Sequence, residues 1–192
     1  MLASIVDRFG IVIGVTVLVG VPLGITVAII LARRRVAAGW PRVWAQRSAL
    51  AEVGMVVGTV PWVWMIMTPT GGAGGVRLVP FRDLANVIAG GDAIVQLIGN
   101  LLVFSAIGFL LPIRFRLGST WTVVPEVVIL AAILSATLEV LQLVLSLGRV
   151  TSLDDVLINT FGAAIASLIS LPWWRARIER FPEANPTNDR SA

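Results

Sequence analysis

The sequence predicts an all-α, polytopic membrane protein, a bundle of about five transmembrane helices. The chain of 192 residues is 57% hydrophobic and only 14% charged, and its mean hydropathy is +0.90. These values lie outside the range of ordinary soluble domains. Several apolar segments also reach the length of about 20 residues with which a helix crosses the hydrocarbon core of a bilayer. The predicted spans are residues 9–32, 48–67, 93–113, 123–147 and 153–174.

The first two spans form an N-terminal two-helix segment, residues 1–67. The first is predicted to be a retained helix rather than a signal peptide, because its basic cluster follows the apolar run instead of preceding it. Pairs of glycines four residues apart, such as Gly54 and Gly58, indicate close packing of helices within the chain.

The remaining three spans belong to a second unit, residues 68–174, which begins with a long connection. Its stretch TPTGGAGG is expected to be a flexible link, and the residues after Pro80 are expected to form a short helix in the membrane interface. A polar tail, residues 175–192, is predicted to be cytoplasmic and disordered, particularly from Pro182 onward.

The arginines predict the orientation of the bundle. Of 15 basic residues, all arginine, eleven lie in the connections after the first and third spans and in the tail, which share one side of the membrane. Basic residues concentrate in cytoplasmic connections. The N-terminus is therefore predicted to be outside and the C-terminus in the cytoplasm, so the net charge of +4 is attributed to membrane topology and no nucleic-acid partner is expected.

The composition excludes many kinds of chemistry. The chain has no cysteine, histidine or tyrosine. It therefore has no disulfide, thiolate nucleophile or imidazole proton shuttle, and it lacks the ligands that dominate zinc sites. Any chemistry must come from carboxylates, amides, hydroxyls and arginine, and no cofactor or metal site is expected.

Polar side chains gather in the outer halves of the last three spans, whose inner halves are almost entirely apolar. In each span such residues recur at three- or four-residue intervals, which places them on one helix face. They are Asp92, Gln96 and Asn100 in the third span, Glu139, Gln142 and Ser146 in the fourth, and Asp155 and Asn159 in the fifth, which also begins with Asp154. This pattern predicts an outward-open polar cleft that is closed toward the cytoplasm.

Glu139 is the candidate least easily explained as structural. It lies eight residues before the outer end of its span at Leu147, which is about 12 Å at the rise of a helix. An ionisable group at such depth costs about 2.5 to 3.5 kcal/mol on insertion scales, so it is a functional candidate by default. Arg149, in the following turn, is expected to pair with Glu139 or Asp155.

Structural roles remain open for the other candidates. Asp154 and Asp155 open a helix, where a carboxylate can cap free backbone amides. Asn100 and Asn159 can link helices by hydrogen bonds, and Gly162 begins a strip of small residues that lets a neighbouring helix approach closely.

The segment EVLQLVLSLGRVTSLDDVLINTFGA resembles the signature of the VanZ-like family. That signature is Glu-x-x-Gln on one membrane helix, an arginine in the next turn, and Asp-x-x-x-Asn-x-x-Gly at the start of the following helix. The matching residues are Glu139, Gln142, Arg149, Asp155, Asn159 and Gly162. The segments RLVPF, from Arg77, and IGNLLVFSAIGFLLP, from Ile98, are also similar to the family.

Two positions depart from the family pattern. Ala106 stands where the family often has proline, which favours a straighter third helix, and Ser152 stands where many members have an additional aspartate, which makes a metal-like acidic cluster less credible.

The resemblance implies a multi-pass protein of the bacterial cytoplasmic membrane, related to one that confers low-level resistance to teicoplanin. Combined with the predicted orientation, it leads to the hypothesis of a non-catalytic protein that binds a lipid-linked cell-wall precursor or a lipoglycopeptide, with membrane lipids as its other partners. Arg149 would contact an anionic head group, and Asn100, Glu139, Gln142, Asp155, Asn159 and Gly162 would shape the site.

Two other classes of function stay open. In an intramembrane enzyme acting on a lipid-linked substrate, Glu139 and Asp155 would be the acid and base. In a proton-coupled transporter, Glu139 would carry the proton. The transporter fits less well, because no polar path crosses the inner halves of the spans and the sequence has no inverted repeat.

Overall fold

The computed structural model describes residues 2–81, 93–115 and 120–180, and it confirms the predicted fold class. Five of its helices are long and apolar enough to cross a membrane, and each overlaps one predicted span. They are Phe9–Ala37, Arg42–Met67, Gln96–Arg114, Thr122–Val144 and Leu153–Trp173. The interfacial helix expected after Pro80, the residue Asp92 and the tail from Pro182 onward fall outside the described residues, apart from Phe81.

The elements follow one another as mostly long helices with two short strands between them. The first span consists of α1 (Leu2–Val15), the π-helical turn η1 (Thr16–Gly20) and α2 (Val21–Ala37). The later helices are α3 (Arg42–Met67), α5 (Ala93–Val103), α6 (Ser105–Arg114), α7 (Thr120–Val144) and α8 (Leu153–Arg180). The strands β1 (Gly75–Arg77) and β2 (Val150–Ser152) pair in parallel, with Gly75 opposite Val150.

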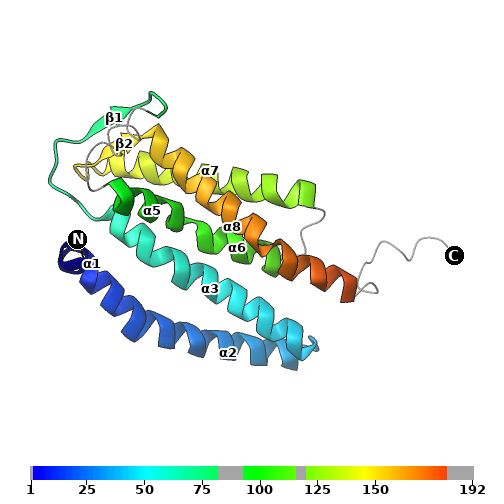
Figure 1. Cartoon of the computed structure of the whole chain (residues 1–192). Helices are drawn as coiled ribbons and strands as arrows, with labels where there is room; N and C mark the ends of the chain where they lie inside the picture. The colour runs from blue at the N-terminus through cyan, green and yellow to red at the C-terminus, as the bar shows by residue number, and fades with distance from the viewer. Residues whose placement is uncertain (1, 82–92, 116–119, 181–192) are drawn as a thin grey trace.

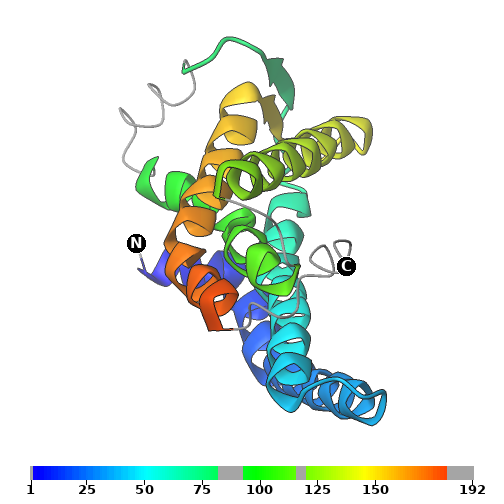
Figure 2. The same cartoon turned by 90° about the vertical axis from the view of Figure 1, so that its right-hand side faces the viewer.

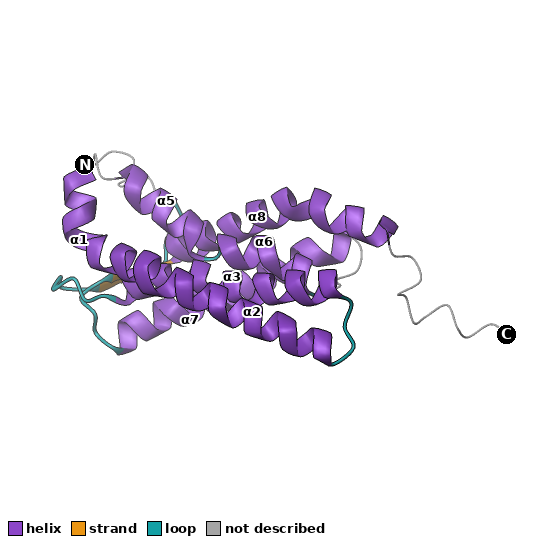
Figure 3. Cartoon of the chain, turned by 90° about the horizontal axis from the view of Figure 1, so that it is seen from below, coloured by secondary structure: helices purple, strands orange, loops and turns teal. Residues whose placement is uncertain are grey.

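The helices pack in a row in which α2 contacts α3, α3 contacts α6, and α8 lies between α5–α6 and α7 (Figure 1). A view turned by 90° shows that α7 runs at an angle to α8 (Figure 2). The start of α1 and the end of α8 lie at opposite ends of the bundle (Figure 3). We call the end that carries β1, β2 and the α7–α8 turn the sheet end, and the end that carries the α2–α3 turn and the C-terminus of α6 the arginine end.

Glycines bring the central helices into close contact. A Cβ atom on Gly162 of α8 would overlap the backbone of Leu101 in α5, and one on Gly108 of α6 would overlap the backbone of Ala163 in α8. Gly58 approaches α6 in the same way, because its Cβ would lie 2.6 Å from that of Ala106. Small residues matter at such interfaces because lipid provides no hydrophobic drive for helix association. The expected role of Gly54 and Gly58 in packing within the chain is confirmed.

The third span was predicted to be one continuous helix, but in the structure it consists of the two helices α5 and α6. It breaks at Phe104, whose φ of −112° and ψ of 10° separate α5 from α6. The side chain of Phe104 is buried in the core with Val103, Val127, Ala131 and Ala163. The apolar pattern does not reveal such a break, because a change of backbone direction at one residue leaves the segment as hydrophobic as before. The alanine at position 106 does not make this span continuous.

The small sheet was not predicted. The connection TPTGGAGG was expected to be a flexible link, but Thr70 donates its backbone N–H to the carbonyl of Leu147, at 3.0 Å, and its hydroxyl to that of Gly148, at 2.9 Å. Gly74 and Gly148 have φ values of +68° and +70°, a conformation that favours glycine. These glycines allow two connections that are far apart in the sequence to pack backbone against backbone.

The close contact at Gly162 generates a test of the packing. Replacing Gly162 by alanine should lower the free energy of unfolding by about 1 to 3 kcal/mol, because the new methyl group has to displace the α5 backbone. Gly99→Ala is the matched control, since no atom lies within 4 Å of that Cβ position. It should leave stability unchanged or raise it by up to about 1 kcal/mol. Denaturant unfolding in detergent micelles measures both, and equal losses would contradict the packing described here.

Candidate functional site

Glu139, on α7, binds the strand β2 that follows this helix. The residue is only 7% exposed, and Oε2 accepts a hydrogen bond of 2.9 Å from the backbone N–H of Ser152. The hydroxyl of Thr151 donates to the backbone carbonyl of Glu139, at 3.3 Å. The carboxylate therefore satisfies a buried amide in β2, one residue before α8 begins.

The turn between α7 and β2 is shaped by two residues in the left-handed region of backbone space. Ser146 has φ of 50° and Gly148 has φ of 70°. Ser146 was expected to share the helical face of Glu139 and Gln142, but α7 ends at Val144 and Ser146 belongs to this turn. The tight reversal returns the chain toward α7 and places Arg149, which is half-buried, directly before the strand.

Asp154 binds a segment outside α8. The residue is 3% exposed, and Oδ1 accepts a hydrogen bond of 2.6 Å from the backbone N–H of Phe81. At the start of α8, the hydroxyl of Ser152 accepts a hydrogen bond of 3.2 Å from the N–H of Asp154, as an N-cap residue does. Asp154 thus ties the chain after β1 to the start of α8.

Asp155 points to a different neighbour. Its Oδ1 accepts a hydrogen bond of 2.5 Å from the side-chain amide of Asn100, which joins α8 to α5. Both residues are half-buried. Gln96, one turn before Asn100, is exposed.

Two buried amides join further helices. The side-chain amide of Gln142 donates to the carbonyl of Ile66, at 2.9 Å, which belongs to the last turn of α3 and has no partner within that helix. Asn159 donates to the hydroxyl of Ser135 on α7, at 2.8 Å. Its side-chain oxygen is buried and has no hydrogen-bond partner among the described residues.

Charge concentrates around Glu139. Asp155, with the same charge, and Arg149, with the opposite charge, both act electrostatically on its carboxylate. The structure therefore brings the predicted site residues together at the sheet end. We call the following set the polar cluster: Asn100, Glu139, Gln142, Arg149, Asp155 and Asn159. Gly162 lies one turn beyond Asn159 in α8, against the α5 backbone.

The cluster combines an arginine with acidic and amide groups, which can bind and orient an anionic or hydroxyl-bearing ligand. Within the described ranges, no group of three or more histidine, cysteine, aspartate or glutamate side chains is arranged to hold a metal ion.

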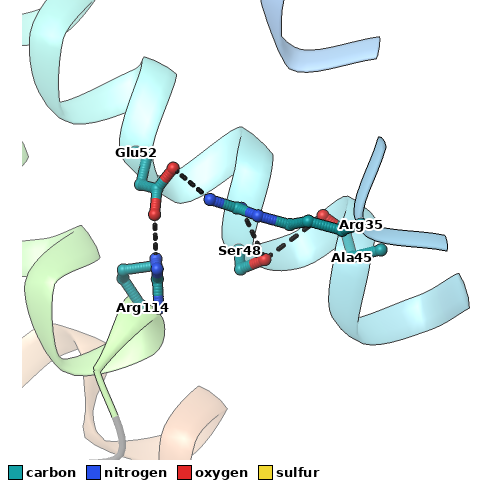
Figure 4. A network of polar contacts seen from close by, with 5 residues as sticks. All are labelled: Arg35, Ala45, Ser48, Glu52 and Arg114. Carbon is teal, nitrogen blue, oxygen red and sulfur yellow. Dashed lines mark hydrogen bonds and ion pairs between the residues drawn. The ribbon is translucent and has the colours of Figure 1, made fainter. Parts of the chain in front are cut away.

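Several contributing residues were not identified from the sequence. The hydroxyl of Ser135 can bond the backbone of its own helix, so this residue did not stand out, and Ser152 was noted only as a departure from the family pattern. Glu52, on α3, was also missed. Its carboxylate lies between Arg35 and Arg114 at the arginine end (Figure 4). Glu52 could have been recognised from the sequence, because it is an acidic residue within a predicted span, as Glu139 is.

Comparison with known proteins identifies the family. A family model described as VanZ/LLP1 matches residues 50–175. The chain belongs to the VanZ/LLP1 family. The match runs from within α3 to within α8, so it contains the whole polar cluster and leaves α1, η1 and α2 outside. No curated protein and no solved structure matches the chain.

The anchoring of β2 in this VanZ/LLP1 protein can be tested at Glu139. Glu139→Leu should lower the free energy of unfolding by about 1 to 3 kcal/mol, because the buried N–H of Ser152 loses its acceptor. Glu139→Gln keeps a side-chain oxygen in place and should cost less. Amide hydrogen exchange across Val150–Ser152, measured together with denaturant unfolding, checks both variants. Unchanged protection in Glu139→Leu would show that the bond does not hold β2.

Proposed function

We propose that this membrane protein binds an anionic, lipid-linked ligand through the polar cluster. The ligand would be a cell-wall precursor or a lipoglycopeptide, and its binding would contribute to tolerance of teicoplanin-type antibiotics. The support is that residues from three membrane helices and one turn bring a cation, two carboxylates and amides together at one end of the bundle.

The distribution of arginines supports an outward position for this end. The basic residues of the α2–α3 turn and of the end of α6 lie at the opposite end of the bundle, and such residues concentrate on the cytoplasmic side. In this orientation the polar cluster faces the outer leaflet of the bacterial cytoplasmic membrane. Lipid-linked cell-wall precursors and lipoglycopeptides are present in that leaflet.

Arg149 is the residue on which the proposal depends. It is half-buried between the left-handed Gly148 and β2, and it acts electrostatically on Glu139. A guanidinium in such a position offers several donors in a fixed plane, which suits the bidentate binding of phosphate or carboxylate. The surrounding hydrogen bonds hold the backbone of this turn in place, so the position from which the arginine side chain extends is fixed before a ligand arrives.

The test is to change the chemistry of position 149 while keeping the fold. Arg149→Ala should weaken binding of teicoplanin or of a lipid-linked precursor about 10- to 100-fold, the value of a charge-assisted hydrogen bond. Arg149→Lys should give an intermediate loss, because it keeps the charge and loses the planar donor arrangement. Arg77→Ala, which removes an exposed arginine of β1 outside the polar cluster, is the matched control.

Two measurements serve this test: ligand binding to purified protein in nanodiscs, and teicoplanin susceptibility of an expressing bacterium. The amount of each variant in the membrane fraction has to match that of the wild type. Binding and susceptibility unaltered in Arg149→Ala would rule the proposal out.

One observation favours a second candidate function, catalysis on a lipid-linked substrate. Asp155 acts electrostatically on Glu139, and paired carboxylates in different environments can divide the roles of acid and base. The hydrogen bond from Ser152 to Glu139 favours the binding function instead, because it gives this carboxylate a structural task.

Turnover distinguishes the two functions. If the protein is an enzyme, purified wild type should convert a lipid-linked precursor, and Glu139→Gln should abolish conversion while it retains ligand binding. Product analysis by mass spectrometry provides the measurement. Conversion that survives in Glu139→Gln would remove Glu139 from any catalytic role.

A further inference from the structure

A second polar network lies at the arginine end of the bundle, far from the polar cluster. Glu52 of α3 accepts from two arginines. Nη2 of Arg35 donates to one carboxylate oxygen at 2.5 Å, and Nε of Arg114 donates to the other. Nη1 of Arg35 also donates to the hydroxyl of Ser48, at 2.8 Å. Figure 4 shows the carboxylate between the two guanidinium groups, which come from α2 and α6.

This network fixes the α2–α3 turn against the end of α6. Its three charged side chains are only 17 to 28% exposed. Two arginines share a single carboxylate, so the network carries one excess positive charge. Its geometry holds the first two spans to the third at the level where these helices end.

Exposed arginines surround the turn that the network holds. Arg33 and Arg34 precede it in α2, and Arg42 and Arg47 follow it at the start of α3. Between them stands Trp40, which is 42% exposed. The guanidinium carbon of Arg35 lies 5.5 Å from the centre of its ring. An exposed tryptophan next to clustered arginines at the ends of membrane helices is typical of the head-group level of a bilayer.

We propose that the arginine end is a binding surface for the phosphodiester head group of anionic phospholipids such as phosphatidylglycerol. The surface consists of Arg33, Arg34, Trp40, Arg42 and Arg47, and the Glu52 network holds it in position. Guanidinium groups bind phosphate oxygens in bidentate fashion. Each arginine near an anionic membrane surface contributes about a fivefold gain in affinity. The tendency of basic residues to lie on the cytoplasmic side accounts for arginines at this end, but it does not require that these arginines bind a lipid.

The experiment compares thermal unfolding of the full chain in nanodiscs of phosphatidylcholine alone and of phosphatidylcholine with phosphatidylglycerol. The anionic lipid should raise the unfolding temperature, and most of this shift should disappear when NaCl is raised from about 0.1 to about 0.5 M, because salt screens exposed charges. Inorganic phosphate added to phosphatidylcholine nanodiscs should not reproduce the shift. Absence of the shift, or its reproduction by free phosphate, would overturn the proposal.

A double variant assigns the effect to this surface. Arg42→Gln/Arg47→Gln leaves Arg33, Arg34 and Arg35 in place as the topological signal, and it should lose about half of the lipid-dependent shift. The matched control is Arg77→Gln, an exposed arginine in β1 at the other end, which should keep the whole shift. A double variant with the full shift would place lipid binding elsewhere. If this variant does not fold, the salt and phosphate measurements on the wild type still decide the question.

Discussion

The close approach of α8 to α5 and α6 is the contact on which the rest of the structure depends. At Gly162 and Gly108 there is no room for a β-carbon, because the backbone of the neighbouring helix occupies its place. In a bilayer, such contact replaces the hydrophobic effect as the reason for helices to associate. It also brings Asp155 to Asn100, since Asp155 lies about two turns before Gly162 in α8 and Asn100 directly precedes Leu101 in α5.

Several polar side chains in this packed core form hydrogen bonds with backbone groups of other elements. Gln142 satisfies a carbonyl at the end of α3, Glu139 satisfies an amide of β2, and Asp154 satisfies the amide of Phe81. A backbone group that is shielded from water needs a partner in the protein, and these side chains provide it. This requirement gives the connections at the sheet end a defined structure, and Arg149 is positioned by these connections rather than by a helix.

The two ends of the bundle differ in chemistry. The sheet end combines carboxylates, amides and one arginine around short, tightly packed connections. The arginine end combines several exposed guanidinium groups with one shared carboxylate. The apolar middle of the bundle separates these two polar regions, so each can meet a different set of molecules at its own membrane surface.

The sequence by itself determined the helical membrane fold, the five spans, and the residues that meet at the sheet end, because hydropathy and helical spacing depend only on the order of side chains along the chain. The family signature also separated Asp155 from Asp154. Only the tertiary structure decided the individual partners: Ser152 for Glu139, Phe81 for Asp154, and the two arginines for Glu52. It likewise decided the break at Phe104 and the pairing of β1 with β2. Most of these features depend on backbone groups, which are alike at nearly every residue and so leave no mark in the sequence. The pairing of Glu52 with its two arginines depends instead on how three helices from distant parts of the chain pack together.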